Sequence, residues 1–201
     1  MIRVLLAEDQ GMMRGALALL LALESDIEIV ADVASGDAVV PAAIDARPDI
    51  ALLDIEMPGM SGLDAAAALR QAVPDCKVLM LTTFGRPGYL RRAMEVGASG
   101  FLVKDAPVEE LAAAIRKVLA GERVVDPTLA AAALSVGPNP LTDREREVLG
   151  VAVDGSTIAD IAGRLHLSES TVRNYLSSAI GKTGSRNRME AIAAARSQGW
   201  L

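Results

Sequence analysis

The chain has very few aromatic residues and only one cysteine. Phe, Trp and Tyr together make up 2% of its 201 residues, so any core must be built from aliphatic side chains and alanine. Cys76 has no second cysteine with which to form a disulfide bond, which fits the reducing cytoplasm, where we expect the protein to work. The longest apolar run falls well short of the roughly 18 residues that a membrane-spanning helix needs. We therefore expect no membrane span. The N-terminus carries one Arg and has the pattern of a strand from its second residue, so we expect no signal peptide either.

Negative charge is distributed unevenly along the chain. Residues 1–139 contain 12 Lys and Arg against 19 Asp and Glu, whereas residues 140–201 contain 8 against 7. The first part is thus acidic and the second is close to neutral, which favours two functional units. Because the second part has no strong basic excess, charge alone does not identify a nucleic-acid-binding domain.

The first part alternates short apolar runs with segments of helical periodicity. Strands are predicted at residues 2–7, 27–33, 49–54, 77–83 and 100–104, and helices at residues 10–24, 36–46, 62–72, 87–96 and 107–120. Five strand–helix units in this order predict a doubly wound, five-stranded parallel sheet of the flavodoxin-like α/β type. Pro41 lies within the second helical segment, where it is expected to kink the helix or delay its start.

Polar residues stand where several of these strands end. Asp54 ends the third strand, Glu8-Asp9 follows the first, and Thr82 and Lys104 end the fourth and fifth. The carboxyl ends of parallel strands share one edge of the sheet, so these five side chains should converge there. Crowded carboxylates require a proton or a cation, and an all-oxygen ligand set favours Mg²⁺. A carboxylate nucleophile, a metal, a hydroxyl and a fixed cation are the groups that phosphoryl transfer needs.

The second part is expected to be entirely helical. Thr142 and Glu145 form a capping box in front of a first helix, and residues 157–165 form a short second helix. Ser168 caps a third helix that runs to about Lys182, and residues 187–198 form the last one. The tight turn between the two middle helices predicts a helix-turn-helix module.

Chain-breaking residues separate the two parts. Gly121 follows the last strand–helix unit, and Gly137-Pro138-Asn139-Pro140 is a strong breaker cluster. We therefore place the first domain at residues 1–121, a linker with a short helix at residues 122–140, and the helical domain at residues 141–201.

The motifs of the first domain resemble the receiver domain of response regulators. The matching residues are Glu8-Asp9, Asp54-Ile55-Glu56-Met57-Pro58 with Gly62, Thr82, and Phe101-Leu102-Val103-Lys104. The resemblance implies that Asp54 accepts a phosphoryl group from a sensor histidine kinase and that Thr82 and Lys104 contact that group.

The same resemblance implies a metal site and a switch. Mg²⁺ would be held by Asp9, Asp54 and the backbone carbonyl of Glu56, with Glu8 assisting through water. Phe101 would swing inward when Thr82 moves toward the phosphoryl group.

The second domain resembles the LuxR-type helix-turn-helix. The match covers residues 141–149, 158–162 and 168–175 and includes Lys182 and Arg188. Together the two domains are similar to the NarL/FixJ class of response regulators, and residues 82–89 and 171–175 are most similar to its DesR-type members.

The third helix of the module is expected to lie in the major groove of double-stranded DNA. Arg suits guanine and Asn suits adenine through paired hydrogen bonds, and basic or hydroxyl side chains suit phosphates. The predicted DNA-binding residues are Arg173, Asn174, Ser177, Ser178, Lys182 and Arg188.

The first helix of the chain has more apolar surface than one packed face requires. Met13, Leu17 and Leu21 form a stripe beside a second apolar stripe, which indicates either a deeply buried helix or a partner surface. We predict that phosphorylation promotes a homodimer through this stripe and the last helix of the first domain, and that the dimer binds a palindromic operator. RNA polymerase is a further candidate partner.

The overall prediction is a DNA-binding transcription regulator that is not an enzyme. Two alternatives stay open at this point. A magnesium-dependent phosphohydrolase could use Asp54 in the same acidic pocket, and the helical domain could bind protein in place of DNA.

Overall fold

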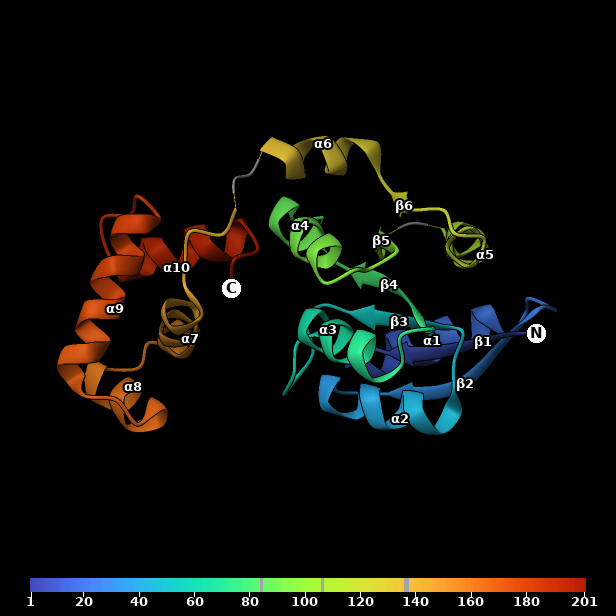
Figure 1. Ribbon diagram of the computed structural model, residues 1–201, viewed down its shortest axis with the longest axis horizontal. Coiled ribbons are helices and arrows are strands. Elements are labelled where there is room, and N and C mark those ends of the chain that lie inside the picture. The colour runs from blue at the N-terminus through green and yellow to red at the C-terminus, as the bar shows by residue number, and fades with distance from the viewer. Residues whose placement is uncertain (84, 106, 136–137) are drawn as a thin grey trace. The chain divides into compact units, whose positions relative to one another are not determined.

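The computed structural model describes residues 1–83, 85–105, 107–135 and 138–201. These residues form two compact units, one of Met1–Gly85 with Leu90–Ala131 and the other of Arg86–Tyr89 with Ala132–Leu201. Figure 1 follows the chain through its elements from the N-terminus to the C-terminus. In the described part of the chain, no helix is both long and apolar enough to cross a membrane.

A parallel sheet forms the centre of the first unit. Its strands are β1 (Ile2–Ala7), β2 (Ile27–Val33), β3 (Ile50–Asp54), β4 (Lys77–Thr82), β5 (Gly100–Val103) and β6 (Val124–Val125). They lie in the order β2-β1-β3-β4-β5-β6, and every neighbouring pair is parallel. The predicted α/β class is confirmed, but the sheet has one strand more than predicted. The two residues of β6 pair with Gly100 and Phe101 of β5 and are too few to show a strand pattern in sequence.

Helices connect the strands of the first unit. They are α1 (Gly11–Leu21), α2 (Val39–Ala46), α3 (Gly62–Ala72), α4 (Pro87–Glu95) and α5 (Val108–Leu119). Alternate residues of β1, β3 and β4 pack with α1 and α5 in one aliphatic cluster, with Leu52, Leu79 and Ile115 fully buried. The shortage of aromatic residues is thus met by close packing of leucine, isoleucine and valine.

Pro41 delays the start of α2, as its position predicts. A short 3₁₀ turn, η1 (Gly36–Ala38), precedes the helix, which begins at Val39. Pro41 then occupies the first helical turn, where backbone N–H groups have no partner within the helix and the missing donor costs little.

The second unit contains the predicted helical module. Its helices are α7 (Asp143–Val151), α8 (Ile158–Leu165), α9 (Glu169–Lys182) and α10 (Arg188–Ser197), and α6 (Pro127–Ser135) precedes them. The capping box of Thr142 and Glu145 is present, and Ser168 caps α9 through the N–H of Thr171. Val136 and Gly137 of the predicted linker lie outside the described residues.

Candidate functional site

The side chains predicted from the strand ends converge at one edge of the sheet. Glu8 follows β1, Asp54 ends β3, and Thr82 ends β4, and all three are buried. Carboxylate oxygens of Glu8, Asp9 and Asp54 lie within 4.8 Å of one another. The sequence therefore predicted this cluster of acids correctly, including its place at the carboxyl end of β3, a strand buried along its whole length.

Lys104 connects two of these acids. Its Nζ lies 2.6 Å from Oε2 of Glu8 and 2.9 Å from Oδ2 of Asp54, and only 6% of its side chain is exposed. Its backbone N–H donates to the carbonyl of Thr82 at 2.8 Å, which fixes the lysine to the end of β4. A buried ammonium with two carboxylate partners is held firmly, because moving it away would leave two buried carboxylates without a cation.

Burial and pairing act in opposite directions on the protonation of this pair. Burial raises the pKa of Asp54, and the hydrogen bond from Lys104 opposes that rise without cancelling it. Burial also lowers the pKa of Lys104, but its hydrogen bonds to Glu8 and Asp54 outweigh burial and leave its pKa raised. Lys104 is therefore a permanent cation beside the carboxylate of Asp54.

The residues around the acids fit a divalent cation. A cavity of about 230 Å³ opens beside Asp54, lined by Asp9, Gln10, Asp54, Glu56, Thr82 and Thr83. Three carboxylates and one ammonium leave two negative charges, which a divalent ion would offset. Both oxygens of Glu8 are already engaged, since Oε1 accepts the N–H of Gln10 at 3.2 Å and Oε2 forms an ion pair with Nζ of Lys104 at 2.6 Å. Asp9 and Asp54 are thus better placed than Glu8 for direct ligation, and oxygen ligands suit Mg²⁺.

Phe101, the predicted switch residue, is already inside the protein. It lies on β5 opposite Met80 of β4, and its side chain is almost completely buried. Thr82, its predicted partner in the switch, is buried as well. The structure therefore shows the aromatic ring in its inward position. It does not show the outward position from which the ring was predicted to swing.

Part of the predicted DNA-binding surface of α9 faces solvent. Val172, Leu176 and Ala179 are buried in the core of the second unit. Arg173, Asn174 and Ser177 are exposed on the opposite side of the helix, as the helical period requires. Arg173 also pairs with Glu169 one turn earlier, at 2.7 Å.

Three other predicted DNA-binding residues have partners within the unit. Ser178 Oγ donates to Oε1 of Glu145 at 2.6 Å, and Lys182 Nζ donates to Oε2 at 2.8 Å. The guanidinium of Arg188 donates to the carbonyl of Ser156 at 2.8 Å. These side chains therefore stabilise the fold of the module, which sequence reasoning did not foresee.

Glu145 is the residue whose importance the sequence understated. Besides its capping contact with the N–H of Thr142 at 2.6 Å, its buried carboxylate accepts from Ser178 and Lys182 of α9. Burial raises its pKa, but these hydrogen bonds outweigh burial and lower the pKa to about 2. The signal in the sequence was an acid at helical spacing with Val148 and Leu149, on the face that packs into the core.

The predicted dimer stripe on α1 is wrong at Leu21. That side chain is 0% exposed and belongs to the core, whereas Met12, Leu19 and Leu23 are 91%, 73% and 80% exposed. The reason is geometric, because a step of four residues turns about 40° around a helix, so a stripe that starts at the edge of the core enters it two steps later. Met13 and Leu17 are half-buried.

Comparison with known proteins decides the family. A model of the response regulator receiver domain matches residues 4–116, and a model of bacterial regulatory proteins of the luxR family matches residues 139–195. The chain belongs to the response regulators. It is 46% identical to the transcriptional regulatory protein DesR of Bacillus subtilis strain 168 over 201 residues, which is all of both chains.

Other relatives agree with this family. The DNA-binding transcriptional activator DevR/DosR of Mycobacterium tuberculosis is 36% identical over 95% of this chain and 92% of its own. The crystal structure of the response regulator ChrA of a heme-sensing two-component system is 34% identical, with a TM-score of 0.58 over 100% of this chain and 98% of that one. The protein is thus a response regulator of the NarL/FixJ class, with a receiver domain and a LuxR-type DNA-binding domain, and its relatives regulate transcription in two-component systems.

Proposed function

We propose that Asp54 is the phosphoacceptor of this regulator and that its phosphorylation promotes dimerisation and binding to an operator. The proposal divides the chain into a receiver at residues 1–121, a linker at residues 122–140 and a DNA-binding domain at residues 141–201. The partners are a sensor histidine kinase and double-stranded DNA, both met in the cytoplasm, and RNA polymerase is a further partner for a DNA-bound dimer. The observation that carries the proposal is the buried Asp54 carboxylate, which pairs with Lys104 and opens into a cavity lined by further acids that suit a divalent cation.

The proposed reaction moves a phosphoryl group from a kinase histidine to Asp54. A carboxylate oxygen of Asp54 forms the new bond to phosphorus, the bond from phosphorus to the histidine nitrogen breaks, and its electron pair returns to the imidazole. Bound Mg²⁺, held by Asp9, Asp54 and the Glu56 carbonyl, would offset charge on the phosphoryl oxygens. Lys104 supplies a fixed positive charge at the same place, and Thr82 supplies a hydroxyl donor.

Labelling with a small phosphodonor tests this assignment directly. The full chain is incubated with acetyl phosphate and Mg²⁺, digested and measured by mass spectrometry. We expect one added PO₃ unit on the peptide that contains Asp54, and none on that peptide in Asp54→Asn, because an amide is a far weaker nucleophile than a carboxylate. An adduct on another peptide would move the acceptor elsewhere.

The same incubation separates a regulator from a phosphohydrolase. A regulator takes up about one phosphoryl group per chain and loses it slowly, whereas a magnesium-dependent phosphohydrolase turns over its substrate many times. We expect phosphate release from acetyl phosphate and from simple phosphoesters to stop at low stoichiometry. Sustained turnover that disappears in Asp54→Asn would favour the enzyme.

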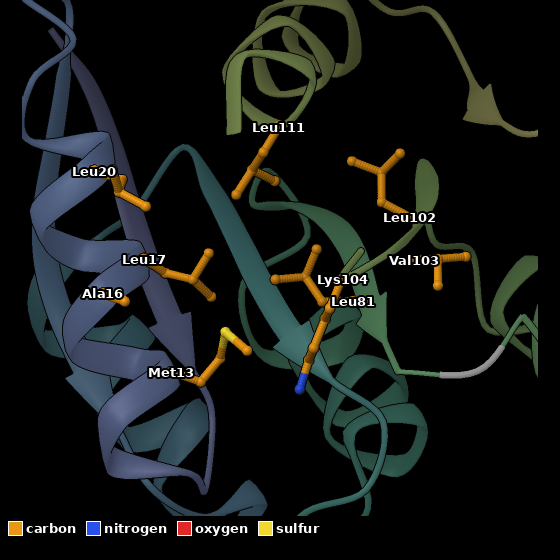
Figure 2. A pocket seen from close by; sticks show the side chains of 9 residues that line it. All are labelled: Met13, Ala16, Leu17, Leu20, Leu81, Leu102, Val103, Lys104 and Leu111. Carbon is orange, nitrogen blue, oxygen red and sulfur yellow. The ribbon is translucent and has the colours of Figure 1, made fainter. Parts of the chain in front are cut away.

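The route from Asp54 to a dimer begins at the side-chain stem of Lys104. Figure 2 shows this stem beside Leu81, with Met13 and Leu17 projecting toward it from α1, and these residues line a cavity of about 120 Å³. A phosphoryl group on Asp54 would compete with Glu8 for Nζ of Lys104, so the wall of this cavity would move with phosphorylation. Phosphorylation can favour the dimer only if it stabilises the dimer more than the monomer. We assign this difference in stability to the change of partner of Lys104, from Glu8 to the phosphoryl group.

The proposed dimer uses α1 and α5 of the receiver. The exposed residues Met12, Leu19 and Leu23 replace Leu21 in this proposal, while Met13 and Leu17 support the surface from beneath. Large exposed apolar side chains on α1 and just after its end indicate a partner surface. A dimer with two-fold symmetry presents two α9 helices to a palindromic operator.

DNA recognition is assigned to the exposed face of α9. Arg173, Asn174 and Ser177 are free of the core and suit base edges and phosphates. Ser178 and Lys182 connect α9 to Glu145 of α7. Their part in DNA binding is therefore to fix the position of α9 and to keep the Lys182 ammonium near the C-terminal end of that helix. Arg188 fixes the start of α10 to the loop before α8 through Ser156.

A further inference from the structure

The turn that precedes α2 packs against the loop between β3 and α3. Residues 55–61 of this loop carry Glu56, the proposed carbonyl ligand of Mg²⁺. The turn η1 begins at Gly36, which is buried, and it follows the end of β2, where the carbonyl of Val33 accepts the N–H of Glu8 at 3.1 Å. The turn and the acidic site therefore stand at the same edge of the sheet.

Gly36 makes a contact with this loop that no other residue could make. A Cβ atom at position 36 would stand 1.9 Å from the carbonyl oxygen of Met60 and 2.7 Å from its carbonyl carbon. Gly36 is not among the glycines with positive φ, so its backbone conformation does not require glycine. The close approach to the backbone at Met60 is what requires it.

The same turn touches the loop at a second point. Oδ2 of Asp37 lies 1.8 Å from the place where a Cβ of Gly59 would be, and Gly59 has a left-handed φ of 74°. At its other end the loop closes on its own first residue, where the N–H of Gly62, the first residue of α3, donates to the carbonyl of Ile55 at 3.0 Å. The loop is thus fixed at its end by α3 and on its outer side by η1.

We propose that Gly36 is a positioning residue for magnesium binding in the receiver. Its contact with Met60 sets the path of residues 55–61 and thereby the position of the Glu56 carbonyl, four residues before Met60. A displaced carbonyl weakens metal binding, because Mg²⁺ demands near-ideal octahedral geometry. This inference rests on the proposed function, since it concerns the metal site of the same phosphoacceptor.

The test compares Gly36→Ala with Gly15→Ala in the full chain. Gly15 lies in α1, and a Cβ there meets nothing within 4 Å, so this variant adds the same methyl group without a clash. The Mg²⁺ concentration for half-maximal labelling by acetyl phosphate is measured for each, together with Mg²⁺ binding by calorimetry. We expect that concentration to rise about tenfold in Gly36→Ala, the size typical of losing an outer contact of a metal site, with wild-type values in Gly15→Ala.

Further readouts separate positioning from general damage. We expect labelling of Gly36→Ala at saturating Mg²⁺ to approach the wild-type plateau, whereas a purely structural role would lower the plateau and the unfolding temperature without moving the half-maximal Mg²⁺ concentration. Equal half-maximal concentrations in the two variants would overturn the inference and leave the proposed function intact. A wild-type chain that is not labelled at any Mg²⁺ concentration would overturn both.

A second pair of variants covers the case in which Gly36→Ala does not fold. Asp37→Ala removes the carboxylate that makes the other contact of the turn, the one with Gly59, and adds no atom that could clash. Asp45→Ala on α2 removes the same charge from the exposed surface and serves as its control. A half-maximal Mg²⁺ concentration that rises several-fold in Asp37→Ala alone supports the proposal that the turn positions residues 55–61 for Mg²⁺ binding. Equal values in the two variants contradict it.

Discussion

At the scale of single residues, Asp54 and Glu145 are buried carboxylates with opposite surroundings. Asp54 has one fixed cation, Lys104, and an open cavity, and burial raises its pKa. Glu145 has three donors from two segments and a pKa lowered to about 2. The first arrangement leaves a carboxylate oxygen available for chemistry, whereas the second uses the carboxylate to join α7 to α9.

The role of Glu145 can be measured by unfolding. We expect Glu145→Gln to lower the free energy of unfolding of the DNA-binding domain by about 1–3 kcal/mol, because a neutral amide has only one acceptor oxygen for Ser178 and Lys182 and leaves the buried pair without its negative charge. Glu147→Gln is the control, since Glu147 pairs with Arg144 at the surface, and exposed pairs contribute roughly 0–1 kcal/mol. Urea unfolding of the full chain, followed by the fluorescence of Trp200, gives both values.

The pH dependence of this contribution has a definite sign. The pKa of Glu145 is lowered from 4.5 to about 2 in the folded state, so its stabilisation is complete above the unfolded value of 4.5. It is lost as the pH falls from 4.5 through about 2, where the folded carboxylate takes up its proton. The stability difference between wild type and Glu145→Gln should therefore shrink across this range. A difference that is constant from neutral pH down to the lower value would show that the charge of Glu145 contributes nothing.

At the scale of elements, α1 has a dual position in the receiver. One side packs Leu21 into the core, and the other presents Met12 and Leu19 to solvent, with the exposed Leu23 just beyond the end of the helix. The edge between these sides lines the cavity that includes the Lys104 stem. A helix in this position can transmit a change at Asp54 to a partner surface without unfolding.

Charging this surface should block the dimer without disturbing the receiver. We expect phosphorylated Leu19→Asp to remain monomeric in light scattering after size-exclusion chromatography, because burying an unpaired carboxylate in an apolar interface is costly. Ile44→Asp on α2 is the control, because Ile44 is also an exposed large aliphatic residue and lies on a different helix. Labelling at Asp54 should be normal in both variants, and a phosphorylated dimer of Leu19→Asp would contradict the assignment of the interface to α1.

At the scale of the whole molecule, the sequence predicts contacts that are local and fails where distant segments meet. The strand–helix alternation, the caps of α7 and α9 and the convergence of Asp54 with Glu8 follow from periodicity and from the geometry of parallel sheets. The strand β6, in contrast, exists only because β5 offers it an edge.

Three site residues show the same limit. The burial of Leu21 depends on how α1 is rotated against the sheet. The tertiary role of Glu145 depends on which residues of α9 face α7, and that of Gly36 depends on the approach of Met60. The helical spacing of Glu145 with Val148 and Leu149 indicates that it faces the core of the unit, but the sequence does not identify the residues that Glu145, Leu21 and Gly36 contact.

The measurement that tests the account most directly is DNA binding with and without a phosphodonor. Fragments of the source genome are captured with wild-type protein and with Asp54→Asn, each with Mg²⁺ in the presence and absence of acetyl phosphate, and are then sequenced. We predict that phosphodonor enriches fragments with two related half-sites about one DNA turn, roughly 10 base pairs, apart for wild type, and that Asp54→Asn gains nothing. Enrichment that is the same with and without phosphodonor, or an equal gain in Asp54→Asn, would contradict control of DNA binding through Asp54.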